Sequence, residues 1–248
     1  KKLNIITGWF TFLVAIITYL MTIEPTASFW DCGEFITTAF KIEVGHPPGA
    51  PLFMLLGRFF TLFSNAQGAA VMMNILSALA SAFTIAFLFW TITHLTKRLI
   101  TKEENPTLGQ TIAILGSGLV GGLAYTFSDT FWFSAVEAEV YGTSSFFTAI
   151  VFWAILKWEN VADEKYSNRW LILICYLAGL SIGVHLLNLL AIPAIAFIYY
   201  YKRYKVTNKG IILALGISAL ILGAILYIII PGVVSLATVF ERIFVNGI

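Results

Sequence analysis

The chain has 248 residues, of which 59% are hydrophobic and only 11% carry a formal charge. With a mean hydropathy of +0.87, it has more apolar surface than one soluble core can bury, so lipid must be its solvent. The net charge of +2 and the lack of a Lys/Arg tract interleaved with aromatic residues argue against nucleic acid as a partner. Cys32 and Cys175 lie in different segments and in no metal-ligand spacing, so we expect neither a disulfide nor a zinc site.

Six long apolar runs predict membrane-crossing helices, because a helix needs about 20 residues to cross the hydrocarbon layer. The run at 170–201 is long for one crossing and short for two, and basic residues flank both of its ends. We therefore expect two short helices that go out and back and meet near residues 183–185. The predicted fold class is an all-α polytopic membrane protein with seven transmembrane helices, and the last helix is expected to end at Pro231. The runs are 3–22, 69–95, 109–127, 141–158, 170–201 and 211–230.

The distribution of basic residues predicts the orientation. With Lys1 and Lys2 in the cytoplasm, all but three of the 15 Lys and Arg residues fall on the cytoplasmic side. The opposite face is acidic and is expected to face the periplasm or an equivalent lumen. The chain begins at Lys1 rather than at Met, so we interpret residues 1–248 as a single transmembrane domain from the N-terminal part of a longer protein.

The first outer loop, residues 23–68, carries two carboxylates next to the first crossing. The apolar spacing of 28–42 and 51–63 predicts two interfacial helices, joined by the stiff HPPGAP segment. Asp31 and Glu34 are three residues apart, so a helix places them on one face, where they can act on one ligand. Carboxylates at this depth are costly to desolvate and are typical of a proton acceptor or a cation site. The alternative is that Asp31 caps the helix and Glu34 decorates its solvated end.

The second outer loop, 128–142, repeats this pattern with acids among aromatic residues. Glu137 and Glu139 are two apart, so on a helix only one of them can face the first loop, and Glu139 is the better candidate. The alternative is an interfacial aromatic segment with ordinary loop acids. Together with Asp31 and Glu34, Glu139 could hold a divalent cation through oxygen ligands. The sequence does not decide whether such a cation binds, and it predicts no other cofactor or metal site.

Three segments resemble a known family. They are WDCGEFITTAFKIEVGHPPGAPLF at 30–53, AEVYG at 138–142 and GLSIGVHLLNLLAIPA at 179–194. The order and spacing are similar to those of a polytopic membrane family of bacterial proteins related to a vertebrate transmembrane protein O-mannosyltransferase. That family in turn is similar to the C-type glycosyltransferases, whose shared module has seven helices and two juxtamembrane helices in a long first external loop.

The resemblance implies a glycosyltransferase that moves a sugar from a polyprenyl-phosphate carrier to an acceptor on the external face. The implied acceptor is a protein or a glycan. Transfer of mannose to Ser/Thr of an exported protein is an extrapolation from one branch of the family. Asp31 matches the position of the catalytic acid and is expected to be the general base, with Glu34 orienting acceptor or sugar hydroxyls. The resemblance also implies a bacterial inner membrane location, with a cytoplasmic N-terminus and a periplasmic active site.

Stabilisation of the departing phosphate needs positive charge near this interface. Arg58 is the leading candidate, with Lys41 and His46 behind it. Alternatively, Arg58 extends to lipid headgroups, and His46 braces the turn that the prolines fix. His185 and Asn188 are three apart, and for them we favour packing between helices over contact with the carrier.

Two other classes of function stay open from the residues alone. A membrane transporter would also place carboxylates, a broken helix pair and a buried histidine around a cavity. A protein that binds the lipid carrier without catalysis is the other possibility. Against a transporter, Asp31, Glu34 and Glu139 gather at one interface rather than at the midplane.

Overall fold

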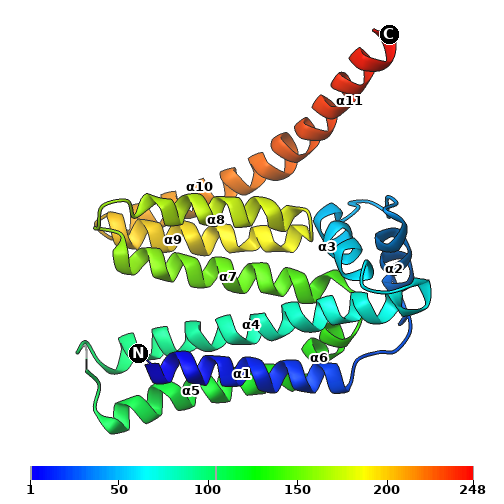
Figure 1. Cartoon of the computed structure of the whole chain (residues 1–248). Helices are drawn as coiled ribbons and strands as arrows, with labels where there is room; N and C mark the ends of the chain where they lie inside the picture. The colour runs from blue at the N-terminus through cyan, green and yellow to red at the C-terminus, as the bar shows by residue number, and fades with distance from the viewer. Residues whose placement is uncertain (1, 104, 248) are drawn as a thin grey trace. The chain divides into compact units, whose positions relative to one another are not determined.

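The computed structural model describes residues 2–103 and 105–247, and these residues form helices and connecting segments without a strand (Figure 1). The chain divides into two compact units, the first ending at Asn188 and the second beginning at Leu189. The prediction of an all-helical architecture is confirmed.

Four long helices dominate the first unit: α1 (Lys2–Met21), α4 (Ala69–Ile100), α5 (Leu108–Thr126) and α7 (Val140–Val161). Helix α4 contacts each of the other three and lies between α1 and α7 (Figure 1). Its buried positions are mostly small, which lets the neighbouring helices approach closely, as is usual for helices packed in lipid. These buried small residues include Ser77, Ala78, Ser81, Ala82 and Ala86.

Shorter helices complete the first unit. The first loop contains α2 (Cys32–Lys41), α3 (Pro51–Thr61) and a 3₁₀ turn, η1 (Ala66–Gly68). The second loop contains α6 (Asp129–Val136), and α8 (Asn168–Ile182) follows α7. The two helices that the sequence predicted in the first loop are therefore present, although α2 begins at Cys32 rather than at residue 28. Their location at a membrane interface stays a prediction.

Among the described residues, five helical stretches are long and apolar enough to cross a membrane: Lys2–Met21, Ala66–Ile100, Leu108–Thr126, Val140–Val161 and Asn208–Asn246. The run at 170–201 is interrupted by a turn at Gly183 and the 3₁₀ segment η2 (Leu186–Leu190), close to the predicted position. Helices α8 and α9 (Ala191–Arg203) have 15 and 13 residues, which corresponds to only about 20 Å each. The two additional crossings in the predicted total of seven stay predictions.

The second unit contains α9, α10 (Asn208–Ala224), a π-helical turn η3 (Ile225–Ile229) and α11 (Ile230–Asn246). The expectation that the last helix ends at Pro231 is wrong, because helical structure continues to Asn246. Proline has no amide hydrogen and its ring crowds the preceding turn of a regular α-helix. The π-helical turn ends at Ile229, in the turn that precedes Pro231, and widens the backbone there, so the helix passes the proline without ending.

The core that supports the first loop joins α2, α3 and the first turns of α4. Phe35 and Ala39 of α2 pack with Phe53 of α3 and with Met73 and Leu76 of α4. The backbone of α3 is also attached to the end of α8, because the Leu52 amide donates to the Gly183 carbonyl at 2.7 Å. Residues far apart in the sequence thus fix the position of α2.

The closest approach in this core lies at Gly57. A Cβ atom there would lie 2.9 Å from the Cβ of Ala39 and 2.3 Å from Sδ of Met73. We therefore expect Gly57→Ala to lower the free energy of unfolding by about 1–3 kcal/mol, because Ala39 belongs to a packed helix and cannot turn away. The thermal unfolding midpoint of the purified protein in detergent measures this loss.

Gly116→Ala is the matched control, because a Cβ atom at Gly116 in α5 meets nothing within 4 Å. This control should unfold at or above the temperature of the unsubstituted protein, since alanine favours a helix. Equal midpoints for the two variants would contradict the packing described here.

Candidate active site

Hydrogen bonds between Glu34 and His46 hold part of the first loop against α2. The Glu34 carboxylate accepts two hydrogen bonds from His46, at 2.5 Å from the backbone amide to Oε1 and at 3.0 Å between Nδ1 and Oε2. On the other edge of the ring, His46 Nε2 lies 3.9 Å from Oδ2 of Asp31. One potential ligand atom from each of the three residues lies within 4.8 Å of the other two. We call Asp31, Glu34 and His46 the acidic cluster.

The local backbone explains why these side chains meet. Asp31 directly precedes the first residue of α2, and its side chain makes no capping hydrogen bond, so its carboxylate remains available to the cluster. The alternative of a capping aspartate is therefore not supported. Gly45 leaves the space that Glu34 fills, because a Cβ atom there would lie 2.9 Å from Oε1. Gly49, with φ of +85°, turns the chain back and donates its amide to the His46 carbonyl.

An apolar support lies beneath the cluster. The ring of Phe35, one residue after Glu34, lies 6.0 Å from the His46 ring, and Phe53 of α3 packs edge-on against Phe35 at 5.6 Å. Phe35 and Phe53 are both buried in the core shared with α4. The position of His46 is thus set by rigid helices as well as by its bonds to Glu34.

The charges in the cluster stabilise one another. The hydrogen bond that the His46 ring donates to Glu34, together with the negative charge of Glu34, raises the pKa of His46 above its ordinary value of 6.5, and the charges of Asp31 and Glu139 act in the same direction. The bonds that the His46 amide and ring donate lower the pKa of Glu34 below 4.5. These shifts favour a protonated His46 beside an ionised Glu34.

Glu139 borders the cluster from the second loop. The residue is 7% exposed, and Sγ of the buried Cys32 lies 3.6 Å from its Oε1. Burial raises the pKa of Glu139; the Cys32 hydrogen bond opposes this shift, and the nearby charge of Asp31 adds to it. Glu139 is therefore a buried carboxyl that holds a proton more readily than an ordinary glutamate, and it is packed against the first turn of α2.

The expected helical geometry of Glu137 and Glu139 is wrong. Both have extended backbones, Glu137 at the end of α6 and Glu139 at the start of α7. Both side chains are buried, and burial also raises the pKa of Glu137. Glu139 contacts Cys32, and the Glu137 side chain forms a hydrogen bond with Ser28, so both acids face the first loop. The expectation that only one of them can do so is wrong, because it assumed helical periodicity.

Arg58 and Lys41 lie at the far end of α2 from Asp31. Arg58 Nη1 donates to the Phe40 carbonyl at 2.6 Å, and its guanidinium lies 5.6 Å from the centre of the Phe40 ring. Lys41 Nζ lies 3.8 Å from Glu43. Because α2 has 10 residues, about 15 Å of helix separates this end from Asp31. The structure therefore brings His46, rather than Arg58 or Lys41, into the cluster.

His185 lies in the turn that follows α8. Its Nδ1 accepts a hydrogen bond from the Leu187 amide at 3.1 Å, and its ring lies 5.5 Å from that of Tyr141 at the start of α7. Asn188 is buried and accepts hydrogen bonds from two hydroxyl groups of α7, those of Ser144 and Thr148. Interhelical packing is thus observed for Asn188, whereas His185 adjoins the segment that carries Glu139.

Sequence reasoning missed the part that Cys32 plays at this site. Cys32, Phe35 and Ala39 occur at the spacing of one helical face and are all buried. That spacing could have identified Cys32 as the residue of α2 that faces inward. Burial and the charges of Glu137 and Glu139 raise the pKa of its thiol to about 12, so it is a packing group and hydrogen-bond donor rather than a nucleophile.

The acidic cluster also has the donor set of a divalent metal site. Two carboxylates and one imidazole suit Zn²⁺ or Mn²⁺ better than Mg²⁺ or Ca²⁺, which prefer oxygen ligands. The converging set is Asp31, Glu34 and His46, whereas the sequence suggested Asp31, Glu34 and Glu139. Because Nδ1 of His46 already bonds Glu34, a metal ion that used this nitrogen would replace that bond.

The Glu34–His46 pair predicts a shifted histidine titration. The chain has three histidines, and NMR of selectively labelled protein should show His46 titrating above 6.5. Glu34→Gln should move its pKa back toward 6.5, whereas Glu43→Gln, which removes an acid paired with Lys41, should leave it unchanged. A His46 pKa at or below 6.5 in the unsubstituted protein would contradict the pairing.

The same pair predicts how loop stability depends on pH. The contribution from His46 is fully present below its ordinary pKa of 6.5 and is lost as pH rises through the raised value. The contribution from Glu34 is present above 4.5 and is lost as pH falls through the lowered value. Exchange of the amide hydrogens of residues 43–46, 49 and 50 should therefore be slowest, after correction for its intrinsic pH dependence, between pH 4.5 and 6.5.

Comparison with known proteins identifies relatives of this chain. The relatives include the protein O-mannosyl-transferase tmem260 of Dictyostelium discoideum, 27% identical over 195 residues that cover 76% of this chain and 22% of the relative. They also include the protein O-mannosyl-transferase TMEM260 of Mus musculus, 24% identical over 217 residues that cover 86% of this chain and 28% of the relative. The chain thus spans about a quarter of the length of these relatives. No solved structure matches it.

The family model for the protein O-mannosyl-transferase TMEM260 N-terminal domain matches residues 31–208. This range begins at Asp31 and contains the acidic cluster, Glu139 and His185, and it covers well over half of the chain. The chain therefore belongs to the TMEM260 N-terminal domain family.

Proposed function

We propose that this chain forms the donor-side module of a membrane glycosyltransferase, which moves a sugar from a polyprenyl-phosphate carrier to a hydroxyl group of an exported protein. The names of the relatives support mannose as the sugar and protein as the acceptor. The observation that carries the proposal is the acidic cluster, in which two carboxylates and a histidine converge at the first residues of the family match.

Asp31 is the proposed general base. Its side chain is 55% exposed, so an acceptor hydroxyl can reach it, and it makes no capping bond to α2. As the acceptor oxygen bonds to the anomeric carbon, its proton passes to Asp31. The bond from the anomeric carbon to the phosphate oxygen breaks, and its electron pair leaves with the polyprenyl phosphate. Glu34 holds His46 through both carboxylate oxygens and retains lone pairs that can orient sugar hydroxyls.

We assign His46 as the first cation to stabilise the departing phosphate, because its pairing with Glu34 favours the charged form. Arg58 and Lys41 are second candidates, since they lie at the other end of α2 and Arg58 is engaged with the Phe40 carbonyl. Glu139 is a positioning residue through its contact with Cys32. His185 is proposed to contact the carrier beside Tyr141.

The proposed setting is the external interface of the membrane. Residues 28–30 expose two large aromatic side chains, Phe29 and Trp30, and α3 with the turn after it exposes Phe59 and Phe63. Aromatic side chains of this kind insert at the headgroup level of a bilayer. This arrangement would hold the acidic cluster where a lipid-linked sugar arrives, with the N-terminus on the cytoplasmic side.

The decisive experiment compares Asp31→Asn with the unsubstituted full-length protein, using radiolabelled polyprenyl-phosphate mannose and an acceptor protein. Loss of a general base should reduce transfer by about 10²–10⁴-fold, while photo-crosslinking to the carrier and the unfolding temperature remain unchanged. Glu43→Gln is the control, because it removes an exposed acid of the same loop that is paired with Lys41 outside the cluster.

Full transfer by Asp31→Asn would refute the assignment of the base. Carrier binding without transfer in the unsubstituted protein would favour a carrier-binding protein. Movement of the labelled carrier or sugar across a vesicle membrane without transfer would favour a transporter.

A further inference from the structure

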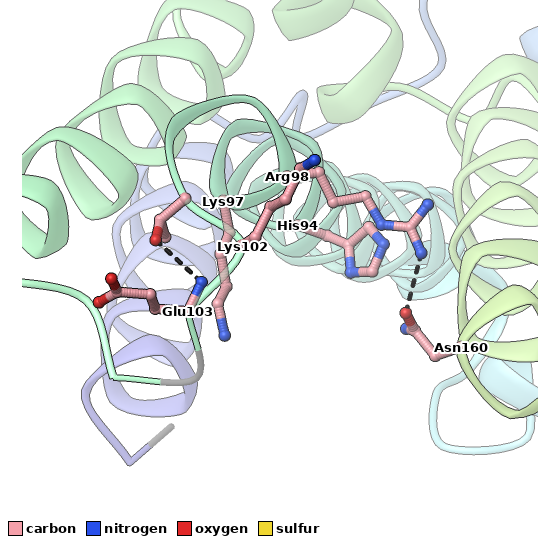
Figure 2. Close-up of a pocket in the computed structure, with 7 residues that line it drawn as sticks. His94, Lys97, Arg98, Lys102, Glu103 and Asn160 are labelled. Carbon is pink, nitrogen blue, oxygen red and sulfur yellow. Dashed lines mark hydrogen bonds between the residues drawn. The ribbon is translucent and has the colours of Figure 1, made fainter.

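A second polar site lies at the other end of α4. A cavity of about 450 Å³ has four basic groups in its wall, His94, Lys97 and Arg98 from the last turns of α4 and Lys102 from the segment that follows (Figure 2). Thr101 and Asn160 add a hydroxyl and an amide. We call this cavity the basic pocket.

The basic pocket is separate from the acidic cluster. The core beneath the cluster includes Met73 near the start of α4, whereas the basic pocket begins at His94. These 21 residues correspond to about 30 Å along the helix axis. The two sites therefore lie at opposite ends of α4, within the same compact unit.

The pocket wall has excess positive charge. Arg98 is held in place by an ion pair with Glu159 at 2.5 Å and a hydrogen bond to Asn160 at 3.0 Å, the latter drawn in Figure 2. Within residues 2–103 and 105–247, neither Lys97 nor Lys102 forms an ion pair with a carboxylate. Glu103 is the one acidic residue in the described wall. Two ammonium groups thus remain to attract an anion.

One wall residue also has an unmet hydrogen-bonding requirement. Nε2 of His94 is buried and has no partner among the described residues. A buried polar atom without a partner costs free energy unless a ligand or water supplies the missing bond. A ligand with several acceptor oxygens would meet this requirement and the charge of the lysines together.

The surroundings of the basic pocket favour an amphiphile. On the same end of α4, Leu99 is 88% exposed and Leu95 is 40% exposed. A helix of this length and hydropathy ends at a bilayer surface, where apolar side chains beside a basic pocket can contact acyl chains. We propose that the basic pocket binds a phosphate group, and that the phosphate is carried by the headgroup of an acidic phospholipid.

The test measures thermal unfolding of the purified full-length protein in detergent, titrated with dioctanoyl-phosphatidylglycerol, dioctanoyl-phosphatidylcholine or inorganic phosphate. We expect phosphatidylglycerol to raise the unfolding temperature at lower concentration than phosphatidylcholine. The variant Lys97→Gln/Lys102→Gln should need about thirtyfold more phosphatidylglycerol for the same shift, because each lysine near an anionic lipid contributes about 1 kcal/mol.

Lys165→Gln/Arg169→Gln is the matched control. It removes the same charge from two exposed residues that follow α7 and lie outside the pocket. The control should keep its response to phosphatidylglycerol, and equal losses in the two variants would show a general charge effect and overturn the proposal. If the double variant does not fold, Lys102→Gln alone is compared with the unsubstituted protein in the same titration, because Lys102 lies beyond the end of α4.

The three ligands distinguish the sources of the phosphate. Equal responses to phosphatidylglycerol and phosphatidylcholine in the unsubstituted protein would overturn a site for acidic lipid. A response to inorganic phosphate that matches the lipid and is lost in Lys97→Gln/Lys102→Gln would keep the phosphate site but assign it to a soluble anion.

Discussion

The bonds between Glu34 and His46 are the interaction on which the candidate active site depends. They join the first turn of α2 to the turn that leads into α3, and they place the imidazole between two carboxylates. Without them, the segment from Ile42 to Gly49 would have few contacts to fix it, since most of it is exposed. The cluster therefore has this geometry because the short segment from Ile42 to Gly49 folds back onto α2, and α2 is itself buried on one side.

The support for that helix comes from distant parts of the chain. Met73 and Leu76 of α4 pack beneath α2 and α3, and the Gly183 carbonyl after α8 holds the start of α3. On the inner side, Cys32 contacts Glu139 from a segment 107 residues further on. The helices therefore fix the positions of the side chains in the acidic cluster, as expected for a site that must hold charged side chains in a fixed arrangement.

The sequence predicted those features that depend on local spacing. The three-residue interval of Asp31 and Glu34 predicted their convergence, and the charge at both ends of 170–201 predicted the break near Gly183. The features that it missed depend on tertiary contacts. Glu137 and Glu139 are extended because α6 ends and α7 begins there, and the spacing of residues in the sequence does not indicate this. The π-helical turn before Pro231 likewise depends on how the backbone accommodates a proline within a continuing helix.

An experimental structure of the full-length protein with a polyprenyl-phosphate sugar bound would test directly whether the acidic cluster is the active site. We expect the anomeric carbon to lie beside the Asp31 carboxylate, with the phosphate near His46 and Glu34 still bonded to the imidazole. A sugar bound at the opposite end of α4, or an Asp31 carboxylate turned away from the bound carrier, would contradict it.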